Sequence, residues 1–386
     1  MSIVIDYTKG FFEASPAGET VGDISGNATL DLSSGNVFSH TPTANTTFVF
    51  SNPPASGTAY EFTLKISNAE VTDGYDLGNA SYDSVDLSVS AQDSSPVGLA
   101  FKPDGTKMYI SGNTNDSIYQ YTLSTAWDLS TGSYDSVSFS VASQATNPRG
   151  LSFKPDGTKM YLVGVNSDEV YQYSLSTAWD LSTASYDSVS IDVNSEDTLP
   201  RGLSFKPDGT KMYLSGTSTD NIYQYSLSTA WDLSTASYDS VSFSVASEES
   251  NPYSVQFKSD GTKMFIFGAT GKDVYQYSLS TAWDLSTASY DNVSFNVSSQ
   301  AFSPQSLFFK SDGSKFYVSV GLSSYNVLQY SSSSTLTPSF TYPSSVQWPS
   351  GIAPTDTADG QTDLLRFLTT DGGSTYFGRL LGDNFS

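Results

Sequence analysis

The sequence predicts an all-β protein: a five-bladed β-propeller built from 52-residue repeats and inserted into a β-sandwich-like host domain. The motif FKPDGTKMY, or a close variant, recurs every 52 residues, at Phe101, Phe153, Phe205, Phe257 and Phe309. Each period reads as four short strands, which is the signature of a propeller blade. No window shows sustained 3.6-residue periodicity, so helices are not expected.

The second period illustrates the four strands, called A to D from the central axis outward. GLSF (150–153) and KMYLVG (159–164) flank PDGT, whose Asp-Gly pair indicates a hairpin turn. EVYQYSL (169–175) follows, and SVSIDV (188–193) comes after the connection STAWDLSTAS. In the next copy, VSFSV alternates apolar residues with serine, as a half-buried strand does.

The last blade lacks a strand. Blade five has strands A, B and C at about 306–330 and no strand D after them. A second series, SYD followed by valine, places the segment SYDSVDLSV (81–89) ahead of the first blade as a D strand without partners. Pairing this segment with the strand at 324–330 would close the ring and cover an exposed sheet edge.

The propeller therefore begins and ends at the same connection of blade five, as expected for a domain inserted into another. Strand-like segments on both flanks together form the host domain. The predicted boundaries are an N-terminal arm at 1–26, host parts at 27–78 and 332–386, and the propeller at 79–331.

Composition excludes several classes of function. The 386 residues include 17 basic and 40 acidic residues, a net charge of −23, which argues against nucleic acid and anionic membranes as partners. There is no cysteine, hence no disulfide and no thiolate metal site. No segment is long and apolar enough to span a membrane, and the N-terminus does not read as a signal peptide. We expect release by lysis or within a particle.

The flanks resemble a module of tailed-phage tail-fibre and virion structural proteins. The residues that carry the resemblance are GNATLDLSSGNVFSHTPTANTTFVFSNPPASGTAYEFTL, TYPSSVQWPSGIAPT and DLLRFLTTDGGSTYFGRLLG. In that module the two halves usually follow one another directly, so the propeller interrupts it here. The repeats resemble propeller repeats of structural proteins of phages, especially marine ones. The resemblance implies a place on the virion surface and other virion proteins as partners, with a homotrimer among the candidate assemblies.

The repeats differ from one another on one face. The A–B turns and C–D connections are nearly constant, whereas the B–C and D–A loops vary. Loops on a rigid scaffold commonly carry binding function, although drift after duplication would also vary them. The predicted ligand contacts on this variable face have aromatic or planar cationic side chains: Arg149, Arg201, Tyr253, Phe302 and Tyr325.

Other candidate sites have structural explanations. His40 is the only histidine, which excludes Ser-His-Asp and His-metal arrangements. The repeated Asp-Gly pairs fit hairpin turns. The acidic loop pairs fit solvated loops better than a Ca²⁺ site: Asp168–Glu169, Glu196–Asp197 and Glu248–Glu249. The tryptophans of the C–D connections are interpreted as staples on the outer edge of each blade rather than sugar platforms: Trp127, Trp179, Trp231 and Trp283.

These observations predict a phage virion protein that displays a propeller for recognition of a host-surface glycan or protein. They also predict no enzymatic activity, no cofactor and no metal. A head-decoration or structural protein is the alternative, and a glycan-active enzyme, which would need two carboxylates across a cleft, is the remote one.

Overall fold

The computed structural model describes residues 19–21, 26–41, 46–67, 71–321, 324–332, 334–336, 340–349, 351, 353–354 and 362–385. The chain divides into two compact units. One comprises Met1–Asp73 and Thr335–Ser386, and the other comprises Gly74–Ser334. The second unit runs from Gly74 to Ser334, whereas the sequence-based boundaries of the propeller are 79 and 331. In the described part of the chain, no helix is long and apolar enough to cross a membrane.

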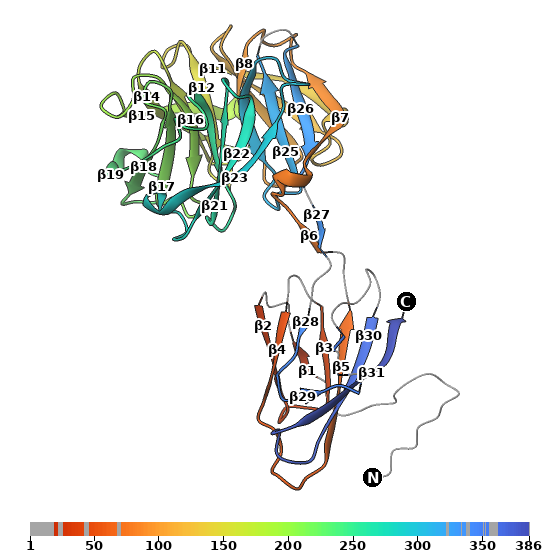
Figure 1. The fold of residues 1–386 in the computed structure, drawn as a ribbon. Coiled ribbons are helices and arrows are strands. Elements are labelled where there is room, and N and C mark those ends of the chain that lie inside the picture. Colours follow the sequence, from red (N-terminus) through yellow and green to blue (C-terminus); the bar gives the residue numbers. More distant parts are fainter. Residues whose placement is uncertain are drawn as a thin grey trace. The chain divides into compact units, whose positions relative to one another are not determined.

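The inserted unit is a five-bladed propeller, with one four-stranded antiparallel sheet per blade (Figure 1). The innermost strands are β8 (Pro96–Phe101), β12 (Pro148–Phe153), β16 (Pro200–Phe205), β20 (Pro252–Phe257) and β24 (Pro304–Phe309). The second strands are β9 (Lys107–Gly112), β13 (Lys159–Gly164), β17 (Lys211–Gly216), β21 (Lys263–Gly268) and β25 (Lys315–Val320). Neighbouring innermost strands contact one another in a closed cycle, in which β24 contacts β8.

The outer half of each blade contains two strands and a single 3₁₀ turn. The third strands are β10 (Ser117–Leu123), β14 (Glu169–Leu175), β18 (Asn221–Leu227), β22 (Asp273–Leu279) and β26 (Asn326–Ser331). The outermost strands are β11 (Gly132–Ser140), β15 (Ala184–Asp192), β19 (Ala236–Ser244), β23 (Ala288–Asn296) and β7 (Ser81–Ser88). The 3₁₀ turns are η1 (Leu77–Asn79), η2 (Leu129–Thr131), η3 (Leu181–Thr183), η4 (Leu233–Thr235) and η5 (Leu285–Thr287).

The ring closes as predicted. β7, the first strand of the unit, pairs antiparallel with β26, the last, in a register that runs from Asn326–Ser88 to Ser331–Ser81. The two strands lie side by side in Figure 1. Since β7 occupies the outer edge of blade five, all five blades have four strands and none is left with three.

The hydrophobic core lies between successive blades. Val163 of blade two packs in one cluster with Leu203 and Tyr223 of blade three, for example, and Tyr317 of blade five packs with Phe101 of blade one. The alternation that predicts half-buried strands is seen in the outermost strands, whose residues alternate between exposed and partly buried positions. Apolar side chains thus point inward from each outer strand, and the polar ones face water.

Each A–B turn is fixed by its own aspartate. In blade one, Oδ1 of Asp104 accepts hydrogen bonds from the backbone N and from Oγ1 of Thr106, at 3.0 and 2.6 Å. Gly105 has φ +74°, and a Cβ atom there would lie 2.3 Å from the Trp127 ring. The turn therefore needs glycine twice, for its backbone conformation and for the close approach of the indole.

In blade five, Tyr75 occupies the position that a tryptophan occupies in the other blades, and it precedes β7 in the chain. Tyr75 has φ +66°, as the repeat tryptophans have (64–66°). A Cβ on Gly313 would lie 2.0 Å from the Tyr75 ring, just as the other turn glycines approach indoles. Tyr75 also stacks on Phe265 at 5.4 Å. The closing segment thus begins at Tyr75, and this moves the boundary of the unit to Gly74.

The described residues of the other unit form a six-stranded and a three-stranded sheet. A six-stranded sheet has the order β1 (Glu19–Val21), β3 (Val37–His40), β5 (Tyr60–Ser67), β30 (Thr362–Thr369), β31 (Tyr376–Phe385) and β29 (Val346–Gln347). A three-stranded sheet has the order β2 (Gly26–Asp31), β4 (Thr46–Ser51) and β28 (Phe340–Thr341). β6 (Val71–Asp73) and β27 (Ser334–Leu336) pair where the chain passes between the units.

Both flanks of the chain contribute to a single core in this unit. Phe62 of β5 stacks on Phe367 of β30 at 4.9 Å, and Phe48 of β4 stacks on Tyr342 at 5.4 Å. Neither flank supplies this core alone. Of the predicted N-terminal arm, residues 1–18 lie outside the described residues, while β1 belongs to the six-stranded sheet, paired parallel to β3.

Candidate functional site

Five equivalent residues, one from each blade, line a small pocket at one end of the propeller axis. Each is the second residue of an innermost strand, directly after its proline, at the end of the strand that adjoins the variable loops. The pocket also includes Gly150 and Ser306. The five residues, called the axial ring below, are Val97, Arg149, Arg201, Tyr253 and Gln305.

The close approach of the innermost strands positions this ring. A Cβ atom on Gly98 would lie 2.2 Å from the carbonyl oxygen of Arg149 in the next blade. Oγ of Ser111 donates a hydrogen bond of 2.8 Å to the same carbonyl. The backbone of Arg149 is therefore held by the neighbouring blade.

The polar side chains of the ring contact one another. Nη1 of Arg149 lies 3.3 Å from Oε1 of Gln305, and Nε2 of Gln305 is in turn held by Oγ of Ser303 at 3.1 Å. The guanidinium carbon of Arg201 lies 4.9 Å from the centre of the Tyr253 ring, within cation–π range. The Nε atoms of Arg149 and Arg201 are both buried without a hydrogen-bond partner.

The two arginines are exceptions to the charge pairing of the propeller. Residues 74–334 include thirteen lysines and arginines, and ten of these lysines form ion pairs with aspartates. Arg149, Arg201 and Lys272 form no ion pair in the described part of the propeller. Lys272 instead lies 4.6 Å over the Phe302 ring.

The arginine pair places two positively charged groups in the pocket. Burial, and secondarily repulsion from Arg201, lowers the pKa of Arg149 to about 10. Burial also lowers the pKa of Arg201, although Tyr253 and Asp197 act in the opposite direction. Because a pKa near 10 still leaves the group charged at neutral pH, the pocket holds two positive charges with no carboxylate bonded to either.

Three of the five residues predicted as ligand contacts meet in the ring: Arg149, Arg201 and Tyr253. Phe302 is 68% exposed in the loop before β24, and Tyr325 lies in the turn before β26 with φ +53°. Neither lines the pocket. Val97 and Gln305 were not predicted, although the 52-residue spacing from Arg149 through Arg201 and Tyr253 extends to both.

A second cavity of about 230 Å³ lies at the opposite ends of the innermost strands. It is lined by phenylalanines that end these strands and by the four repeat tryptophans, Trp127, Trp179, Trp231 and Trp283. The interpretation of these tryptophans as outer-edge staples is therefore wrong, because the C–D connection folds back over the A–B turn toward the axis.

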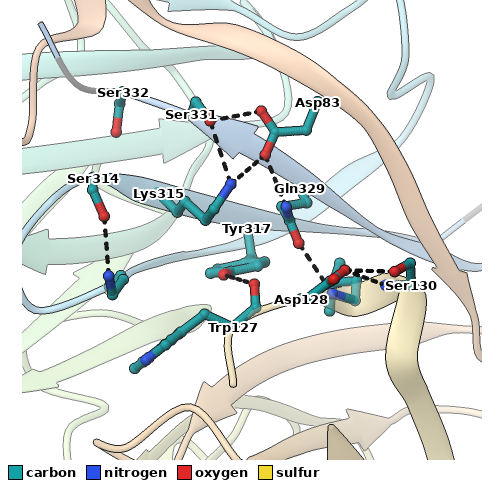
Figure 2. A network of polar contacts seen from close by, with 12 residues as sticks. Asp83, Trp127, Asp128, Ser130, Ser314, Lys315, Tyr317, Gln329, Ser331 and Ser332 are labelled. Carbon is teal, nitrogen blue, oxygen red and sulfur yellow. Dashed lines mark hydrogen bonds and ion pairs between the residues drawn. The ribbon is translucent and has the colours of Figure 1, made fainter. Parts of the chain in front are cut away.

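The tryptophans do join neighbouring blades. Oη of Tyr317 in blade five donates a 2.7 Å hydrogen bond to the carbonyl oxygen of Trp127 in blade one (Figure 2). The same bond links Tyr109 to Trp179, and Tyr161 to Trp231, at 2.6 Å. The Trp127 ring also packs against the Tyr317 ring at 6.2 Å, so the side chain contacts the neighbouring blade rather than the outer edge of its own.

Two of the acidic loop residues, Asp197 and Glu249, bind backbone amides. Asp197 is 1% exposed, and its carboxylate accepts hydrogen bonds from the backbone N of Leu199 and Thr219, at 2.8 and 3.1 Å. Glu249 likewise accepts from the backbone N of Asn251 and Gly271. These two residues are therefore loop clamps rather than the solvated groups predicted. The described residues contain no group of three or more His, Asp or Glu side chains that could hold a metal ion.

His40 has an ordinary packing role in the other unit. It is 1% exposed, and its Nε2 lies 3.3 Å from Oγ1 of Thr46. Its ring packs edge-on against Phe48 at 5.4 Å.

Comparison with known proteins found similarity to solved structures alone. No protein-family model and no curated protein matches the sequence. Solved structures that are similar include a candidate 6-phosphogluconolactonase of Bacteroides uniformis, at 11% identity and TM-score 0.39, with 75% of this chain and 71% of that one covered. The periplasmic gluconolactonase of Pseudomonas aeruginosa aligns at 12% identity and TM-score 0.38, covering 75% and 70%.

A protein from Desulfotomaculum acetoxidans described as functionally unknown is similar to the same degree, with TM-score 0.38, 12% identity and coverage of 75% and 90%. The lactonase names correct the prediction that this chain is not an enzyme. That prediction was drawn from the lack of cysteine and the single histidine, which removes only some kinds of catalyst. Carboxylates and hydroxyls remain, and they can carry general acid–base chemistry.

Proposed function

We propose that the protein is a virion-surface protein whose propeller recognises a host surface through the axial ring and the loops around it. The observation that carries the proposal is the pattern of variation along the innermost strands. The ring position holds Val, Arg, Arg, Tyr and Gln in the five blades, whereas four residues later every blade has phenylalanine. Repeats that are constant within the scaffold and differ at the ends of the strands next to the loops are typical of a binding surface.

The place on a virion rests on the resemblance of the flanks to a tail-fibre and virion structural module. The topology of the propeller fits this role. The chain enters at Gly74 and leaves at Ser334, beside the A–B turn of blade five, where Tyr75 contacts Gly313. Both ends of the propeller are therefore on the constant face.

Competition for virion adsorption tests the proposal. Full-length protein, added in excess to virions that contain it, should reduce their adsorption to host cells. The triple variant Arg149→Ala, Arg201→Ala and Tyr253→Ala should not compete. A matched control, Lys154→Gln with Lys206→Gln, alters the same two blades at the opposite ends of their innermost strands and should compete like the unaltered protein.

Two results would contradict the proposal. One is adsorption that is unchanged by any amount of the unaltered protein. The other is virion density, from electron cryomicroscopy, in which the axial ring is buried against neighbouring subunits of the capsid. The second result would support a head-decoration role instead.

A further inference from the structure

We propose that the axial ring binds a carboxylate of an acidic saccharide, with Arg149 and Arg201 as the groups that hold it. The inference deepens the proposed function and rests on it for the source of the ligand. The ring is the place in the propeller where two guanidinium groups from adjacent blades line one pocket.

The pairing of charge elsewhere in the propeller makes these arginines unusual. Every lysine of the A–B turns and of the second strands is balanced by an aspartate, at N–O distances from 2.6 to 3.2 Å. The protein has a net charge of −23, yet no aspartate or glutamate of the described residues forms an ion pair with Arg149 or Arg201. An anion supplied from outside would complete the site.

The hydrogen bonds already present leave donors for such a ligand. Gln305 takes one amino group of Arg149, and its own amide nitrogen is turned toward Ser303. Tyr253 covers one face of Arg201 through its ring and supplies no acceptor there. The Nε atoms of both arginines remain without a partner. A planar carboxylate matches the fork of guanidinium donors.

Size and charge indicate which ligand this is. The pocket has room for about one water-sized group, so a single oxygen of an anionic group enters it and a whole sugar ring does not. The net charge of −23 opposes the approach of any polyanion, so a polyanion that binds must do so at a local positive site. A surface polysaccharide with carboxylates satisfies both conditions, since single carboxylate groups project from its chain.

Binding of the full-length protein to polygalacturonate tests the inference, at an ionic strength of about 0.15 M so that long-range attraction is screened. The unaltered protein should bind polygalacturonate and should not bind the neutral polymer dextran. Arg149→Gln with Arg201→Gln should weaken binding by about tenfold or more, because charge-assisted hydrogen bonds are lost. Lys154→Gln with Lys206→Gln removes the same charge at the constant face and should change binding less than about twofold.

Folding of the variants is checked by thermal unfolding. The double arginine variant should melt at or above the temperature of the unaltered protein, since it removes two adjacent like charges. Arg149→Lys with Arg201→Lys retains the charge without the planar fork and should bind with intermediate affinity. If the glutamine variant does not fold, a lysine variant that binds polygalacturonate as tightly as the unaltered protein would overturn the inference.

The remaining outcomes show which anion the site binds and whether that binding is linked to adsorption. Equal binding by the unaltered protein and the double arginine variant, or equal binding to dextran, would overturn the anion site. Stabilisation by inorganic phosphate that needs both arginines, without polygalacturonate binding, would show a free oxyanion and overturn the saccharide assignment. Arginine-dependent binding of polygalacturonate by a protein that does not compete for adsorption would leave this inference standing and refute only the proposed function.

Discussion

Lys315 and Asp83 lie 232 residues apart in the sequence, yet Nζ of the lysine is 2.6 Å from Oδ2 of the aspartate. The ion pair joins the two ends of the propeller, because Asp83 belongs to β7 and Lys315 to β25. Gln329 and Ser331 of the strand between them also donate to Asp83, at 2.8 and 2.7 Å (Figure 2). In the other blades the same network lies within one continuous stretch of chain, as at Lys159 and Asp187.

Asp83→Asn should therefore weaken the closure of the ring. The substitution removes the charge that three donors share, and we expect the free energy of unfolding to fall by about 1–3 kcal/mol. Asp187→Asn is the matched control, since it alters the same network in blade two. Hydrogen exchange should increase more along β7 in the first variant than along β15 in the second. Equal increases would show that closure depends little on this network.

Tyr75 should contribute to stability as a core aromatic does. It is 6% exposed and packs on Phe265 and Phe309. We expect Tyr75→Ala to cost about 3–5 kcal/mol in chemical denaturation. Tyr75→Trp restores the residue of the other blades and should change stability by less than about 1.5 kcal/mol. An alanine variant as stable as the unaltered protein would show that Tyr75 does not pack on Phe265 and Phe309 as described.

The stability of the propeller should fall in acid. Although burial raises it, hydrogen bonds from Lys102 and Thr106 bring the pKa of Asp104 down to about 2. The pKa of Asp83 is likewise lowered by Lys315, Gln329 and Ser331 against the effect of burial. A carboxyl whose pKa is lower in the folded state stabilises the protein above the pKa of the unfolded chain, near 4, and loses this effect as pH falls through the folded value.

Thermal unfolding between about pH 5 and pH 2 measures this effect. The melting temperature should decrease as pH falls below about 4. In Asp83→Asn the decrease should be smaller, because one of the titrating groups is gone. A melting temperature that stays constant down to pH 2 would contradict the assignment of these aspartates as charged partners.

The loop clamps should act without a metal ion. Asp197 already directs its carboxylate at backbone amides of two loops. We expect EDTA to leave the melting temperature unchanged, and Asp197→Ala to lower stability by about 1–3 kcal/mol through unsatisfied amides. Ala145, which occupies the equivalent position of blade two, shows that the fold accepts alanine there. A melting temperature that drops with EDTA and recovers with calcium would identify a site that these contacts do not explain.

The sequence predicted the propeller and its closure because tandem copies fix the register of each strand independently of its environment. It did not predict the position of Trp127, since the return of the C–D connection to the A–B turn depends on packing between distant segments. Tyr75 was missed because YDLGNASYD differs from WDLSTASYD at the aromatic residue itself. Val97 and Gln305 were missed because candidates were chosen by side-chain type, whereas their common position in the repeat places them in the ring.

The closure by β7 also sets an order of events during synthesis. β7 leaves the ribosome first among the propeller strands, but its partner β26 ends only at Ser331. At 5–20 residues per second, β7 waits roughly 10–50 s for that partner. Its free edges could meanwhile pair with another nascent chain, as unpaired strands do. The polar residues of β7 include five serines and aspartates at exposed or partly exposed positions, and they make the waiting strand a poor template for such pairing.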